Sequence, residues 1–271
     1  MRRDLPESPR WLESVGRVEE ARELASKFEE DAIRTHGTLP DVEDVPIKVS
    51  GLFPFRLLFT REYIGRTMML WVFQIMQTIG YYGFGSLVPI ILAAKGYTVI
   101  NSLQYTALSY LGYPLGSLLS LLVVERVDRK WLIVSSAFLM GVFGLSFGMA
   151  GSAETIITFG VLYTLVSNIF SNAFHIFQAE IFPTFARATA AGTAYSLSRL
   201  TSGLMPFVLL PVLKLYGATA MFTVVAAAMV IIILDIGMFA PKTARKPLEH
   251  VNEVPYTGTV LTGQQQSTQI E

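Results

Sequence analysis

Long, mostly apolar stretches without charged residues alternate with short charged segments through the middle of the chain. Of the 21 Lys and Arg and 21 Asp and Glu residues, only twelve lie between Thr67 and Pro241. A helix of about 20 apolar residues crosses roughly 30 Å of hydrocarbon. Six stretches are long enough: residues 67–94, 97–124, 131–153, 155–179, 188–213 and 216–240. The pattern predicts an all-α membrane protein in which residues 67–241 form a bundle of six transmembrane helices.

Polar segments flank the predicted bundle. In the first, Val18, Ala21, Leu24 and Phe28 recur every three or four residues among glutamates, which predicts an amphipathic helix that ends near Gly37. The last segment, residues 242–271, is polar and contains the run TGQQQSTQ. That composition is typical of disorder, and we expect a disordered tail there.

The distribution of Lys and Arg predicts the orientation. Six spans put both termini on one side of the membrane, and ten Lys and Arg residues near the span ends fall on that side. The other side has only Lys95 and Lys214. Because cytoplasmic loops carry an excess of Lys and Arg, both termini and the tail are predicted to be cytoplasmic, in a multi-pass protein of the cell (inner or plasma) membrane.

Composition excludes other classes of protein. The chain is 52% hydrophobic and 15% charged, whereas soluble domains have about 25% charged residues. Its formal net charge is zero and it has no basic run suited to nucleic acid, so we expect no nucleic-acid partner. It has no HExxH motif and no Cys, and we expect neither an enzyme, nor a metal site, nor a cofactor.

Three motifs carry a resemblance to a known family. PESPRWLESVGRVEEAR (residues 6–22) resembles the segment after the sixth helix in the sugar-porter and metabolite:proton symporter branches of the major facilitator superfamily. ERVDRK (residues 125–130) resembles the family's DRxGRK loop, and EIFPTFAR (residues 180–187) its E-x-x-P-T-x-x-R stretch. The resemblance implies the second half of a twelve-helix transporter, preceded by a helical cytoplasmic central-loop segment at residues 1–66. The partner implied is an N-terminal six-helix half that is missing from this chain.

The resemblance also implies a gate at the cytoplasmic ends of the helices. Carboxylates and guanidinium groups there can pair across helices in one conformation and separate in another. The residues that match the family's motifs are Glu125, Arg126, Arg129, Glu180 and Arg187. The alternative is that these charges only set the topology.

Polar side chains recur at similar depth in three predicted spans, where substrates of the family bind. Those assigned to substrate binding are Gln74, Gln77, Tyr81, Asn168, Asn172, His175 and Arg199. The same spans and the second one also carry Tyr110, Tyr113, Ser171, Tyr195 and Ser198. Polar groups in a membrane are costly and often functional, although single Gln, Asn or Ser residues also join helices by packing and hydrogen bonds.

Departures from the sugar-porter pattern favour an anionic substrate. His175 stands where sugar porters have an aromatic residue that packs against the sugar, and Met76 replaces one glutamine of their first-span motif. SLSRLTSG (residues 196–203) resembles the fifth-span stretch of the organic-anion groups. Arg199 either binds a carboxylate or forms a structural ion pair. Asp235 is either interfacial or part of a proton relay.

Together these observations predict a transporter for a small organic metabolite, working in the lipid bilayer as a proton-coupled symporter. A carboxylate is favoured over a sugar, and His175 and Asp235 are the candidates for proton coupling. Two alternatives stay open. One is a truncated, non-transporting scaffold or regulatory protein, and the other is a sugar:proton symporter.

Overall fold

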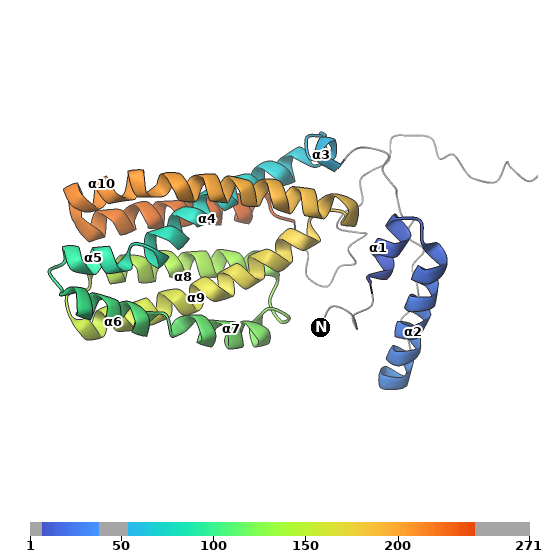
Figure 1. Cartoon of the computed structure of the whole chain (residues 1–271), viewed down its shortest axis with the longest axis horizontal. Helices are drawn as coiled ribbons and strands as arrows, with labels where there is room; N and C mark the ends of the chain where they lie inside the picture. The colour runs from blue at the N-terminus through green and yellow to red at the C-terminus, as the bar shows by residue number, and fades with distance from the viewer. Residues whose placement is uncertain (1–6, 38–53, 242–271) are drawn as a thin grey trace, which may run out of the picture.

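The computed structural model describes residues 7–37 and 54–241, and the regular structure in these ranges is entirely helical (Figure 1). The helices are α1 (Pro9–Ser14), α2 (Val18–His36), α3 (Pro54–Leu57), α4 (Ile64–Gly85), α5 (Val88–Ala94), α6 (Val99–Ser109), α7 (Gly112–Val123), α8 (Arg129–Met149), α9 (Ala153–Glu180) and α10 (Thr184–Phe239). The all-α prediction is confirmed for this part of the chain. The predicted disordered tail lies outside the described residues.

Several helices are long and apolar enough to cross a membrane. Within the described ranges there are four: the stretch formed by α6 and α7, then α8, α9 and α10. Helices α4 and α5 make a fifth if they form one bent span. The 56 residues of α10 would measure about 84 Å if straight, far more than a bilayer core of about 30 Å. Its helical geometry is interrupted at Gly217, where φ is 82°.

The two ends of α10 lie at the same end of the bundle. Lys130 Nζ donates to Ala240 O, just past the end of α10, at 3.0 Å. The neighbouring Arg129 pairs with Glu180, four residues before α10 begins. The chain must therefore reverse direction at Gly217, and Figure 1 shows the two arms of α10 running antiparallel beside α4. Lys214 was the expected turn, but the helix continues past it to the glycine, which takes up a positive φ without strain.

The stretch 67–94, predicted as one helix, is bent by 55° between α4 and α5. Pro89 has no N–H, so it cannot donate to the carbonyl of Gly85 four residues earlier. The hydroxyl of Tyr110 donates to that oxygen instead. Tyr110 itself lies between α6 and α7. One hydrogen bond therefore joins the bend of α4–α5 to the break between α6 and α7.

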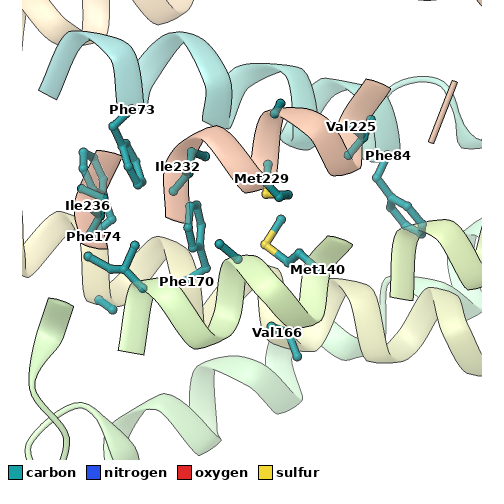
Figure 2. Close-up of a cluster of buried hydrophobic side chains, with 14 of the residues drawn as sticks. Phe73, Phe84, Met140, Val166, Phe170, Phe174, Val225, Met229, Ile232 and Ile236 are labelled. Atoms are coloured by element: carbon teal, nitrogen blue, oxygen red, sulfur yellow. The ribbon is translucent and has the colours of Figure 1, made fainter. Parts of the chain in front are cut away.

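Aromatic side chains fill the core between the helices. Phe73 of α4 stacks on Phe174 of α9, with ring centroids 3.7 Å apart. Figure 2 shows both rings pointing towards Ile232 and Ile236 from the second arm of α10. All four side chains are buried. Their burial stabilises α4, α9 and α10 as one packed unit.

Small residues bring α7 close to α9. Gly112, Gly116 and Ser120 recur every four residues and are buried. A Cβ atom built at Gly116 would lie 2.3 Å from the backbone oxygen of Leu165 on α9. Such spacing is typical of helices that pack tightly in membranes, where close contact replaces the hydrophobic effect.

The amphipathic helix predicted near the N-terminus is confirmed as α2. It ends at Gly37, where φ is 86°, and Lys27 and Glu23 pair on its exposed face at 2.8 Å. The sequence pattern did not predict the short helix α1. The side chains of Leu12 on α1 and Ala21 on α2 are both buried. The two helices pack against each other through these apolar positions.

Candidate functional site

A cavity of about 640 Å³ opens between α4, the α6–α7 break, α9 and α10. Six of the seven residues assigned to substrate binding line it: Gln74, Gln77, Tyr81, Asn168, His175 and Arg199. Tyr110, Tyr113, Ser171, Tyr195 and Ser198 complete most of the wall. The structure thus brings polar side chains from four helical regions to one hollow. Their part in binding a substrate stays a prediction.

Asn172 does not line the cavity. Its side-chain Nδ2 donates to Ser120 Oγ at 2.8 Å and to Asn168 Oδ1 at 3.1 Å. The first bond ties α9 to α7, and the second holds the amide of Asn168 in place at the cavity wall. Asn172 therefore acts in this geometry as a positioning residue one helical turn from the site.

Sequence reasoning missed three lining residues, Thr78, Gly85 and Ser86. Thr78 lies one turn after Gln74 and donates its hydroxyl to the Gln74 carbonyl at 2.7 Å, and that four-residue spacing could have indicated it. Gly85 and Ser86 reach the cavity because the helix bends there. Pro89 was the available signal for that bend.

Arg199 brings a positive charge to the cavity. Its guanidinium carbon lies 4.4 Å from the ring centroid of Tyr195, which is within the range of a cation–π contact. Among the described residues no carboxylate lines the cavity, and no ion pair to Arg199 is formed. The charge is therefore available to an anionic ligand.

Asp235 lies elsewhere in the bundle. The residue is only 9% exposed, and its Oδ2 has no hydrogen-bond partner within the described ranges. It is not among the residues that line the cavity. Arg199 and Asp235 therefore do not form an ion pair with each other in this conformation, and the structural ion pair predicted as one role of Arg199 is not tested by the described residues.

Two of the residues assigned to the gate, Arg129 and Glu180, meet at the end of the bundle where α8 begins. Arg129 Nε lies 3.4 Å from Glu180 Oε1, and the two side chains are only 17% and 18% exposed. Glu125 and Arg126 are exposed in the α7–α8 loop, whereas Arg187 is half-buried in the first turn of α10. The structure thus pairs Arg129 with Glu180, and the gate itself stays a prediction.

Arg66 joins this end of the bundle and was not among the predicted gate residues. Its guanidinium donates to the carbonyl of Ile181, which caps α9, at 2.9 Å. A cation at the C-terminal end of a helix is favourable because the last carbonyls carry partial negative charge. Arg66 therefore ties α4 to the end of α9, beside Glu180.

A second group of hydrogen bonds joins helices at the opposite end of the bundle. Lys95 Nζ donates to the carbonyls of Gly148 and Ala150 at 2.7 and 2.6 Å, and so caps α8. The hydroxyl of Tyr97 donates to Gly151 O at 3.0 Å. Partial burial lowers the pKa of Lys95 below its ordinary value. The α5–α6 corner is thereby held against the α8–α9 turn.

Within the described ranges no group of three or more His, Asp or Glu side chains is placed to hold a metal ion. The chemistry that the cavity offers is recognition, through amides, hydroxyls, aromatic rings and one guanidinium.

Comparison with known proteins identifies relatives. The profile of the family described as "Sugar (and other) transporter" matches residues 3–254. YyaJ of Bacillus subtilis (strain 168), provisionally named a metabolite transport protein, is 34% identical over 200 residues, which are 73% of this chain and 44% of that protein. The niacin transporter NiaP of Acinetobacter baylyi is 26% identical over 254 residues, 91% of this chain and 56% of that protein. The chain spans about half the length of these relatives.

A solved structure has the same fold. The major facilitator superfamily proton:xylose symporter XylE, bound to 6-bromo-6-deoxy-D-glucose, matches with a TM-score of 0.65 and 21% identity. The match covers 91% of this chain and 54% of that protein. At this identity the likeness shows the helical fold of the superfamily, and the ligand stays a property of that protein.

Proposed function

The chain belongs to the sugar (and other) transporter family of the major facilitator superfamily, and we propose on that premise that it takes part in proton-coupled symport of a small organic metabolite, a carboxylate rather than a sugar. The family and the relatives are transporters, not enzymes. The observation that carries the proposal is the cavity, which collects amides and hydroxyls from several helices around a single guanidinium.

Six spans with both ends in the cytoplasm are part of this proposal. They are α4 with α5, α6 with α7, α8, α9 and the two arms of α10, within residues 67–241. The reversal of chain direction at Gly217 divides α10 into two arms and so supports a count of six spans. Reporters fused in the loop at Arg126 should behave as cytoplasmic, and reporters at Lys95 or Glu154 as external. A cytoplasmic signal at Lys95 would contradict the arrangement.

The partner proposed is an N-terminal six-helix half that covers the cavity. The chain spans only 44% to 56% of the two curated relatives. Transporters of this kind work by rocking two bundles about a shared midplane site. We therefore expect no uptake by this chain alone, and uptake when an N-terminal half is co-expressed. The pair Arg129–Glu180 would act as part of a cytoplasmic gate that releases when the halves rock.

The preference for a carboxylate rests on Arg199. A guanidinium binds a carboxylate through two parallel hydrogen bonds, and a charge-assisted contact contributes about 1.5–3 kcal/mol. No acidic side chain from the described residues competes for it in the cavity. One relative is named for the transport of niacin, which is a carboxylic acid, and another for the transport of niacin or nicotinamide. Both points favour an anionic substrate for this chain.

Proton coupling is assigned to His175 or Asp235. His175 is exposed in the cavity, and histidine is a common proton shuttle in proteins. Asp235 is buried, and within the described ranges its Oδ2 lacks a hydrogen-bond partner. In a complete transporter, His175→Gln should flatten the pH dependence of uptake if the histidine couples. A flattened profile in Asp235→Asn alone would assign the coupling to the aspartate.

The experiment is uptake into vesicles. The chain would be co-expressed with the N-terminal six helices of a relative such as YyaJ, and uptake of radiolabelled carboxylates and sugars measured with an inward proton gradient and after its collapse. We expect gradient-dependent uptake of a carboxylate, reduced at least tenfold by Arg199→Gln and unchanged by Arg61→Gln, an exposed arginine outside both the cavity and the gate. Uptake by the chain alone, or uptake independent of the gradient, would refute the proposal.

A further inference from the structure

No purely aliphatic side chain lines the cavity within the described part of the chain. Among the fourteen lining residues, none is Ala, Val, Leu, Ile, Met or Phe, although the rest of the bundle is rich in them. Four tyrosines from three places in the fold supply the apolar wall: Tyr81, Tyr110, Tyr113 and Tyr195. The main apolar contacts that this chain can offer a ligand are therefore aromatic rings.

These rings are held by contacts of their own. The hydroxyl of Tyr110 is committed to Gly85 O, so this side chain presents mainly its ring to the cavity. The ring centroid of Tyr113 lies 5.5 Å from that of Tyr110, with the ring planes 51° apart. The ring of Tyr195 lies under the guanidinium of Arg199. Aromatic rings fixed in this way favour a flat ligand, since ring pairs prefer offset-stacked or edge-to-face contacts.

The cavity has a positively charged side chain and no negatively charged one within the described residues. Arg199 is the single Arg, Lys, Asp or Glu among the lining residues in the described ranges. An ammonium group on a ligand would meet no carboxylate there and would be repelled by the guanidinium. Amines and amino acids are therefore disfavoured, whereas a carboxylate gains a charge-assisted contact.

We propose that the site takes a planar aromatic monocarboxylate without an amino group. The carboxylate binds Arg199, the ring lies among the tyrosines of the α6–α7 break, and polar ring atoms or substituents meet the amides of Gln77 and Asn168. This inference rests on the proposed function, because it names the substrate class of that transport site. It excludes sugars, aliphatic acids and cationic metabolites as preferred ligands.

Binding to the purified 271-residue chain in lipid nanodiscs tests the inference. Radiolabelled benzoate is the probe, in competition with benzamide, cyclohexanecarboxylate, benzylamine and xylose. We expect benzamide to bind roughly ten- to a hundredfold more weakly than benzoate, because it lacks the charge. Cyclohexanecarboxylate keeps the charge but not the flat ring, and should bind about fivefold more weakly or worse. Benzylamine and xylose should not compete.

Variants locate the ring contact. Tyr113→Phe keeps the ring and should bind benzoate like the parent chain, whereas Tyr113→Leu should lose about fivefold or more. Tyr216→Leu, at an exposed tyrosine outside the cavity, is the matched control and should bind normally. Thermal unfolding of each variant confirms that the compared chains are folded.

Two sets of results overturn the inference. Equal binding of benzoate and cyclohexanecarboxylate, tighter binding of xylose, or no binding of benzoate to the folded chain removes the aromatic substrate class. Equal binding of benzoate and benzamide removes the role of Arg199 in recognising charge. The proposed function fails separately, in the vesicle assay, if no proton-dependent uptake of any metabolite occurs. Uptake of an aliphatic acid would keep the transporter and refute only this inference.

Discussion

Replacing Gly112 with alanine should force α7 and α9 apart. The added Cβ would lie 2.2 Å from Val161 O and 2.7 Å from Leu165 N, both backbone atoms of α9. Neither can rotate away, and an attractive contact needs about 3.5 Å or more. The helices must therefore separate locally by roughly 1 Å, which at overpacked sites costs about 1–3 kcal/mol.

Helix propensity acts in the opposite direction and must be removed from the measurement. Alanine is better than glycine inside a helix by about 1 kcal/mol. Gly203 of α10 is a matched control, because a Cβ there meets no atom within 4 Å. The free energy of unfolding of Gly112→Ala should fall below that of Gly203→Ala by about 1–3 kcal/mol.

The assay is unfolding of the purified chain by sodium dodecyl sulfate in mixed micelles, followed by circular dichroism. The same separation should weaken benzoate binding, because Tyr113, next to Gly112 on α7, and Asn168 on α9 both line the cavity. If Gly112→Ala is as stable as Gly203→Ala, α7 and α9 are not in close contact and the reasoning fails.

Two further predictions concern buried polar contacts. Tyr110→Phe leaves Gly85 O without its donor and should cost about 1–3 kcal/mol in thermal unfolding. In a Pro89→Ala background, residue 89 has an N–H that can donate to Gly85 O. The stability lost by Tyr110→Phe should therefore be smaller in that background. An equal loss with and without Pro89 would refute this explanation of the bend. Arg129→Glu should destabilise the chain by placing two carboxylates together, and the exchange Arg129→Glu with Glu180→Arg should recover part of the loss. A double variant no more stable than the single one would show that the pair contributes nothing.

Much of the candidate site was predictable from spacing alone. Gln74, Gln77 and Tyr81 share one face of α4 at intervals of three and four residues, and all three line the cavity. Spacing could not separate Asn168 from Asn172, which are one turn apart on α9. In the structure Asn172 donates to Ser120 of α7, whereas Asn168 lines the cavity.

The amino-acid sequence by itself determined the helical class and the membrane location. Inside a bilayer every backbone polar group must be satisfied within its own segment, so an apolar stretch of sufficient length implies a helix whatever surrounds it. Lys and Arg at the ends of the stretches likewise predict an orientation without any knowledge of packing.

Only the tertiary structure decided how the helices bend and which polar groups meet. Pro89 frees one carbonyl, but the bend persists because Tyr110, from another helix pair, supplies the missing donor. From the sequence Arg199 could bind a carboxylate or form a structural ion pair, and in the structure Arg199 lines the cavity while Asp235 does not. Contacts between segments distant in the chain depend on close packing of whole helices, and local periodicity carries no information about them.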